Sequence, residues 1–419
     1  MSNFVFYDFE TSSSNKAWGQ IIEIGAILTD DDLNELDRFE SKCRLAPGII
    51  PEAMSLIVSN TTPKRLKETN LSHYQMVRQF VEKLKSWGKA TYIGWNNIDF
   101  DQIFWRHTLF QNLEYPFTST ANGNKEGDLI NLARAANLYY PGTLKNRTNE
   151  KGNAEYKLDT MAPLNGIEHA AHTAIGDCSA TLEIAKIIKK KAPSVWNASL
   201  MTTNKDESLK VIKDEKLFCT NEFYYGKVVP FVQTFVCQHP VYQWPKTFDL
   251  KQDPNIYMNM PSEVLKQELK KPPKVLRTCR HNKHPIVMNP SYIDNFGKEV
   301  DNWTGLHRMI GFDFGLTFFY SFLHEWSYKA VTAVMGEKQE QDEPGVIVHH
   351  SALPTLAQEA EGAAPLLASH DSKHPHTPKE SHEHEHPHAH HDIPDTKLAH
   401  HPIQHMDRLA EHPTREHHA

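Results

Sequence analysis

Strand and helix signals alternate along the first 190 residues, and this alternation is the feature that most narrows the folds open to the chain. Short apolar segments are separated by longer ones whose apolar residues recur at helical spacing. Strands are expected at 4–8, 21–29, 36–44 and 90–93, and helices at 73–87, 102–113, 128–138 and 177–190. The pattern favours an α/β fold, with a mixed sheet flanked by helices.

The first predicted strand ends in two carboxylates. The apolar run Phe4-Val5-Phe6-Tyr7 is followed by Asp8 and Glu10. Side chains two residues apart in a strand point to the same face, so these carboxylates should converge at one edge of the sheet. Such a pair can hold divalent cations, because hard cations take oxygen ligands. The alternative is a chance Asp-x-Glu triplet in a chain of 419 residues.

Two later segments carry further candidates. Asp101 lies where a predicted strand gives way to a helix, the place where active-site groups gather in α/β sheets. The alternative role for Asp101 is helix capping. His172 precedes Asp177 by five residues, about 140° of rotation along an ideal helix. We therefore expect His172 on the loop before the helix, able to swing toward a substrate, and Asp177 held by the helix.

The chain resembles the DEDDh 3′→5′ exonucleases in three motifs, which are, in chain order, Asp8-x-Glu10, Asp101 and His172-x4-Asp177. The flanking segments are similar to exonuclease I: 6–11, 61–63, 94–101, 157–159 and 165–169. The resemblance covers about the first 200 residues and continues weakly to about 300. It implies a ribonuclease H-like exonuclease domain at 1–195 and a smaller SH3-like, β-rich domain at 200–300 that lines a DNA channel.

The residue types are suited to phosphodiester hydrolysis with two Mg²⁺ ions, for which Mn²⁺ is expected to substitute. We assign Asp8, Glu10 and Asp177 to the first ion, with Asp8 bridging to the second and Asp101 holding that second ion. His172 is the expected general base, since an imidazole titrates near neutral pH.

Substrate contacts are expected from Glu10 and three further residues. Lys157 stands where exonuclease I usually has arginine; it keeps the positive charge but lacks the bidentate fork. The alternative for Lys157 is a solvated side chain. Thr11 is placed to meet the 3′ terminus, and Asn97 is placed at the loop before Asp101, which it is expected to brace.

A formal net charge of −7 is unusual for a protein that binds DNA, because phosphate contacts come from lysine and arginine. The distribution of charge is more informative than its sum. Residues 186–191 and 266–283 are strongly basic. The second stretch lies in the predicted accessory domain, where it would help to form a groove; the alternative is a solvated face.

The resemblance ends near residue 300, where exonuclease I normally continues into a helical domain. Residues 301–336 are expected to contain a short packing helix, although their composition also fits a displaced reading frame. The apolar stretch 309–326 is too short and too interrupted to span a membrane. The tail, 337–419, holds 17 of the 26 histidines and is predicted to be disordered, with metal binding by the histidines as the alternative.

The resemblance implies a Mg²⁺-dependent 3′→5′ exonuclease that degrades single-stranded DNA to 5′-mononucleotides in DNA repair and recombination. A single-stranded DNA-binding protein is a candidate partner. Scattered cysteines and the lack of a signal peptide indicate a cytoplasmic protein with free thiols, expected to be a monomer without membrane contact. Two alternatives stay open: a DEDDh exonuclease for RNA or proofreading, and a catalytically impaired nucleic-acid- or metal-binding protein.

Overall fold

The computed structural model describes residues 3–215, 217–239, 241–253, 255–258, 260–289 and Tyr292. The predicted helical segment at 301–336 and the predicted disordered tail at 337–419 lie outside these residues. All five cysteines are buried and free, as expected. No helix in the described part of the chain combines the length and apolar character needed to cross a membrane.

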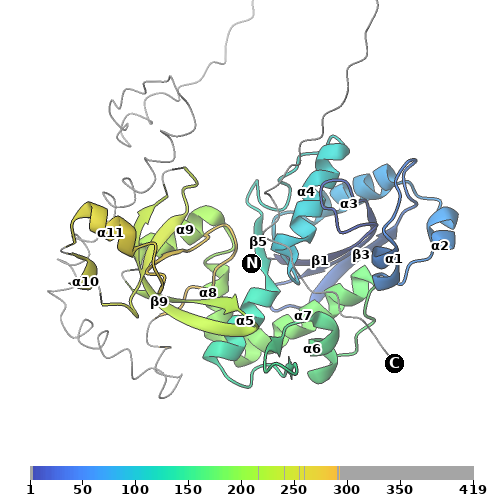
Figure 1. Cartoon of the computed structure of the whole chain (residues 1–419). Helices are drawn as coiled ribbons and strands as arrows, with labels where there is room; N and C mark the ends of the chain where they lie inside the picture. The colour runs from blue at the N-terminus through green and yellow to red at the C-terminus, as the bar shows by residue number, and fades with distance from the viewer. Residues whose placement is uncertain are drawn as a thin grey trace, which may run out of the picture. The chain divides into compact units, whose positions relative to one another are not determined.

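A five-stranded mixed sheet in the order β3-β2-β1-β4-β5 forms the centre of the N-terminal half (Figure 1). Its strands are β1 (Asn3–Thr11), β2 (Ile21–Thr29), β3 (Glu35–Lys42), β4 (Ala90–Gly94) and β5 (Lys125–Asp128). β1 pairs with β2 antiparallel and with β4 parallel. The predicted mixed sheet is confirmed. β5 was not predicted, because its sequence Lys-Glu-Gly-Asp has no apolar run.

Helices cover both faces of this sheet, as the alternation of elements predicts (Figure 1). Alternate residues of β1 point to opposite faces. Phe4 and Phe6 pack with α5 (Leu129–Tyr139) and α7 (Ala174–Lys191), whereas Tyr7 packs with α3 (His73–Trp87) and α4 (Asp101–Gln111). The shorter elements of this half are α1 (Ala53–Val58), α2 (Pro63–Glu68), η1 (Asn97–Asp99), β6 (Arg147–Thr148), β7 (Ala154–Glu155) and α6 (Leu158–Leu164).

A four-stranded antiparallel sheet follows, in the order β11-β10-β9-β8. Its strands are β8 (Phe218–Tyr224), β9 (Lys227–Gln238), β10 (Pro245–Asp249) and β11 (Leu276–Thr278). β-rich pieces were expected at 223–229 and 231–237, but the first of these contains the hairpin turn. Tyr225 and Gly226 have φ of 48° and 76°, so the chain reverses there.

The two sheets share one core. Buried residues of β1, such as Phe4, belong to the same apolar cluster as Val232 and Phe248 of the second sheet. The connecting and flanking helices are α8 (Pro193–Leu200), α9 (Lys205–Asp214), α10 (Asn255–Met258) and α11 (Ser262–Glu268). The expected domain boundary at 195–200 thus falls within α8, whose residues Val195 and Trp196 are buried in that core.

Candidate active site

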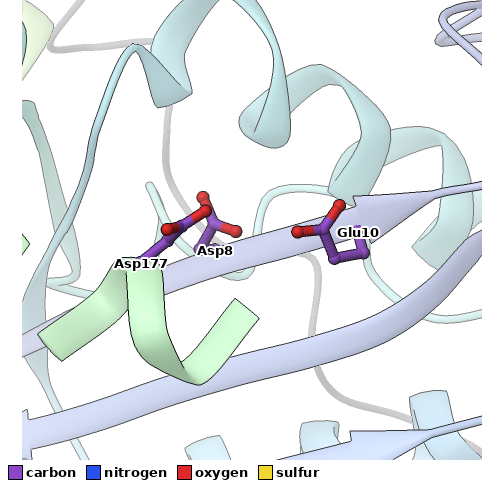
Figure 2. A group of neighbouring side chains, drawn as sticks. All are labelled: Asp8, Glu10 and Asp177. Carbon is purple, nitrogen blue, oxygen red and sulfur yellow. The ribbon is translucent and has the colours of Figure 1, made fainter. Parts of the chain in front are cut away.

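β1 places two carboxylates at the centre of the sheet. Asp8 pairs with Gly25 of β2, and Glu10 pairs with Glu23. Their side chains project from the same strand toward Asp177 at the start of α7 (Figure 2). The buried apolar run 4–7 fixes the strand, so the two carboxylates have a rigid base.

Close packing of α7 on β2 brings the third carboxylate into place. Thr173 caps α7, and its hydroxyl oxygen accepts the Gly176 N–H at 3.2 Å. A Cβ atom at Gly25 would lie 2.4 Å from the backbone carbon of Ala174, so only glycine permits this approach. One carboxylate oxygen from each of Asp8, Glu10 and Asp177 lies within 4.8 Å of the other two.

The electrostatics of this three-carboxylate group suit a divalent cation. Burial raises the pKa of Asp8 well above its usual range, and so do the charges of Asp101, Asp177 and Glu10. Burial also raises the pKa of Glu10 to about 7, reinforced by Asp177 and opposed by Arg65 and Lys42. Clustered like charges disfavour ionisation. A hard cation with oxygen ligands would offset this repulsion, so the residues fit Mg²⁺.

Asp101 lies next to this group but outside it. It is the first residue of α4, whose N-cap is Phe100, so Asp101 does not cap its helix. Instead its Oδ1 accepts the backbone N–H of Phe9 at 3.2 Å, which ties α4 to β1. The Asp101 side chain is buried, and its charge is the second-largest cause of the raised pKa of Asp8.

Two histidines lie near Asp177. His172 is on the loop before α7, as predicted, with a left-handed φ of 65°. The imidazole that contacts the Asp177 carboxylate belongs to His169, through Nε2, and the His169 side chain is only 2% exposed. The histidine that holds the Asp177 carboxylate is therefore His169 and not His172. The sequence signal for His169 was its place in the segment 165–169, which is similar to exonuclease I.

A pocket of about 450 Å³ opens beside Asp177. Both histidines and Lys157, the residue before α6, line it. Asn97 is completely buried, and its amide donates to the Tyr7 hydroxyl at 3.1 Å, so it braces the structure rather than facing the pocket. Thr11 is also buried, and its hydroxyl donates to the Ser13 carbonyl at 2.9 Å.

A comparison with protein-family models finds a match over the segment that contains this site. Residues 5–185 fit the model of the RNase T family, described as exonuclease. This segment includes β1, the start of α4 and α7, and so all the predicted catalytic residues. Residues 5–185 therefore resemble an exonuclease domain of the RNase T family, and this segment is called the exonuclease domain below.

Similar proteins extend the relation beyond this exonuclease domain. Exodeoxyribonuclease I of Buchnera aphidicola subsp. Acyrthosiphon pisum is 31% identical over 213 residues, which are 50% of this chain and 51% of that protein. Exodeoxyribonuclease I of Escherichia coli K12 is 26% identical over 214 residues, 50% of this chain and 45% of that protein. The chain thus spans about half the length of the curated relatives it matches.

The fold is similar to a solved exonuclease. E. coli Exonuclease I in complex with a dA16 oligonucleotide superimposes with a TM-score of 0.62 at 19% identity, covering 77% of this chain and 74% of that one. Exonuclease I from Methylocaldum szegediense also gives a TM-score of 0.62, at 22% identity, covering 78% of this chain and 73% of that one. The likeness covers more of the chain than residues 5–185 alone.

Two further buried carboxylates, which the sequence analysis did not single out, stabilise the elements around the site. Glu23, 1% exposed, pairs with Arg65 at 2.5 Å and accepts the Ala174 N–H at 3.2 Å, so it fixes the start of α7. Glu126 of β5 accepts the Tyr7 hydroxyl at 2.6 Å and an amide N–H of Gln102, the neighbours of Asp8 and Asp101. Glu23 had a sequence signal, because it interrupts the apolar run 21–28.

A larger groove of about 580 Å³ runs between α5 of the exonuclease domain and the second sheet. Basic side chains line it: Arg134, Lys246, Lys274, Arg277, Arg280 and Lys283. Aromatic rings line it as well: Phe223, Tyr224, Tyr242 and Trp244. The basic stretch 266–283 therefore contributes four basic residues to the groove, while Lys266 itself is buried.

Proposed function

We propose that this protein is a Mg²⁺-dependent 3′→5′ exonuclease that degrades single-stranded DNA to 5′-mononucleotides, acting in DNA repair and recombination. The observation that carries the proposal is the group of three carboxylates, Asp8, Glu10 and Asp177, within 4.8 Å of one another beside a pocket. Exonuclease chemistry follows from the domain, whereas the direction of digestion and the substrate are inferred from the relatives.

The side chains have distinct proposed roles. Asp8, Glu10 and Asp177 would hold one Mg²⁺, with Asp8 and Asp101 holding a second; Mn²⁺ would substitute. When bound, such ions would supply an activated water and neutralise charge on the phosphate. His172 accepts the proton of the attacking water, and Lys157 contacts a phosphate of the substrate at the pocket wall.

The groove supports a single-stranded substrate. Proteins that bind single strands combine cationic grooves with aromatic rings on which bases stack. Here Arg280 lies over the Trp244 ring at 5.2 Å, and Tyr242 stacks on Trp244 with ring centroids 4.8 Å apart. We assign the second sheet as the SH3-like accessory domain that lines the DNA path. One solved neighbour is an ExoI/SSB-Ct complex, so the C-terminus of a single-stranded DNA-binding protein is a candidate partner here.

The proposal is tested by digesting 5′-labelled single-stranded DNA and a matching RNA, each with Mg²⁺ and with EDTA. A ladder that shortens from the 3′ end, on DNA with Mg²⁺ only, is expected. Asp177→Asn should lower the rate at least about 1,000-fold, because it removes a metal ligand. Glu183→Gln, an exposed change on the same helix, is the matched control and should retain full activity.

Other outcomes would reject the proposal in different ways. Digestion of RNA in preference to DNA would replace the substrate but keep the chemistry. Cleavage that persists in EDTA, or in Asp177→Asn, would remove the three-carboxylate group from the mechanism. No digestion of either nucleic acid would favour a catalytically impaired binding protein.

A further inference from the structure

Arg134 lies where the active-site pocket meets the basic groove. It is on α5, six residues after Asp128, which ends β5 and caps the helix. Its side chain lines the pocket that contains His172 and Asp177, and it also lines the groove. A strand that passes from the groove into the pocket would therefore cross Arg134.

Two aromatic rings hold the Arg134 guanidinium in place. The guanidinium carbon lies 4.3 Å from the centroid of the Phe223 ring, on β8, and 5.8 Å from that of Tyr156, next to Lys157. These two rings also pack edge to face, with centroids 5.8 Å apart. One ring comes from the second sheet and the other from the pocket wall, so the cation is fixed relative to both.

The guanidinium is short of anionic partners. Arg134 Nε has no hydrogen-bond acceptor among the described residues. The nearby Asp128 carboxylate is occupied by backbone N–H groups, of Asn96 at 2.9 Å and Ile130 at 3.1 Å. In contrast, groove residue Arg277 pairs with Asp249 at 2.9 Å. Burial lowers the pKa of Arg134, which reflects the cost of this poorly compensated charge.

We infer that Arg134 binds a backbone phosphate of the substrate, one that precedes the scissile phosphate along the strand. This inference rests on the proposed function and adds a specific contact to it. The planar guanidinium suits a phosphate, because its N–H groups can donate in pairs. Arg134 would thus couple occupancy of the groove to the position of the 3′ end among the carboxylates.

The first test compares substrates of different length. A dinucleotide has only the scissile phosphate, whereas a dT oligonucleotide of about 12 residues also fills the groove. In Arg134→Met, kcat/KM should fall about 10- to 100-fold on the oligonucleotide and much less on the dinucleotide. Arg134→Lys should recover part of the loss, because it keeps the charge without the fork.

The second test measures binding, with Asp177→Asn as the background so that the strand stays intact. The measured quantity is the slope of the logarithm of the oligonucleotide affinity against the logarithm of the salt concentration. In Arg134→Met this slope should be shallower by about 0.7 for each lost phosphate contact. Arg134→Lys should keep the original slope. Loss of packing alone would lower the melting temperature without changing this slope.

The matched control is Arg147→Met, an exposed arginine on β6 that lines neither cavity. It should leave both kcat/KM values and the salt slope unchanged. An equal loss on both substrates in Arg134→Met, or an unchanged salt slope, would overturn the inference. Absence of digestion by the unmodified protein would instead reject the proposed function, while the binding measurement would still test Arg134.

Discussion

At the residue scale, the surroundings of each acidic and imidazole group separate metal ligands from proton carriers. Asp177 faces Asp8 and Glu10, so it belongs with the metal. His172 lies on a loop at the pocket and is absent from the three-carboxylate group. His169 is almost completely buried against Asp177, which makes it a support for that carboxylate.

This division predicts that two substitutions differ in their effect on metal binding. His172→Asn should lower kcat about 100- to 10,000-fold, because a general base is lost. Because a ligand that binds the folded state stabilises it, Mg²⁺ should raise the melting temperature of the unmodified protein. The His172→Asn variant should keep this rise, whereas Asp177→Asn should lose it. The measurements are single-turnover cleavage and thermal unfolding with and without Mg²⁺. Exposed His107→Asn is the control; a His172→Asn enzyme with nearly full activity would assign the base elsewhere.

At the scale of elements, the site depends on how closely α7 approaches β2. Thr173 and Glu23 fix the first turn of α7, and Gly25 leaves room for its backbone. Because Asp177 is in that turn, a small displacement of α7 would move this carboxylate relative to Asp8.

Gly25→Ala should therefore impair both stability and metal binding. The added methyl group would meet backbone atoms of Ala174 and Ile175 at 2.4 Å, so α7 must shift. We expect the free energy of unfolding to fall by about 1–3 kcal/mol, with weaker Mg²⁺ binding. Urea unfolding and Mg²⁺ titration would measure these effects. Ser41→Ala on β3, opposite Ile24, is the control and should change stability by less than about 0.5 kcal/mol. A Gly25→Ala protein that binds Mg²⁺ normally would contradict this account.

At the scale of the whole molecule, the buried His284 ties the segment after β11 to the end of β5 and to α8. His284 Nδ1 accepts the Asp128 N–H at 2.8 Å, and its Nε2 lies 3.0 Å from the Ser199 carbonyl, to which it can donate. Both interactions require a neutral ring with the proton on Nε2. Burial accordingly lowers the pKa of His284 to about 4.

This histidine makes stability depend on pH. An unfolded histidine titrates near 6.5, so between about pH 6.5 and 4 the unfolded chain binds a proton that the folded protein does not. The contribution of His284 is present above pH 6.5 and is lost as the pH falls toward 4. From pH 7 to pH 5 this amounts to about 2 kcal/mol.

Denaturant unfolding of His284→Gln at these two pH values would measure the effect. The variant should be less stable than the unmodified protein at pH 7. From pH 7 to pH 5, however, its free energy of unfolding should fall by about 2 kcal/mol less than that of the unmodified protein. Exposed His107→Gln is the control and should follow the unmodified protein. An identical pH dependence in His284→Gln would show that burial does not lower the pKa of His284 in the folded protein.

The sequence alone determined most of the longer elements of the exonuclease domain and much of its candidate site. Apolar runs and helical spacing are local properties, so they located β1, β2, α3 and α7 to within a few residues. The same local logic put Asp8 and Glu10 on one face of a strand and His172 on the loop before a helix. β5 was missed because four residues with two carboxylates carry no such signal.

Tertiary structure alone decided which of these side chains meet. Asp177 contacts His169 rather than His172, and Asn97 is buried beneath the site instead of facing it. The position of Arg134 between pocket and groove depends on Tyr156 and Phe223, which are 22 and 89 residues away along the chain. Such contacts depend on how sheets and helices pack across long sequence separations, and a local pattern contains no information about that packing.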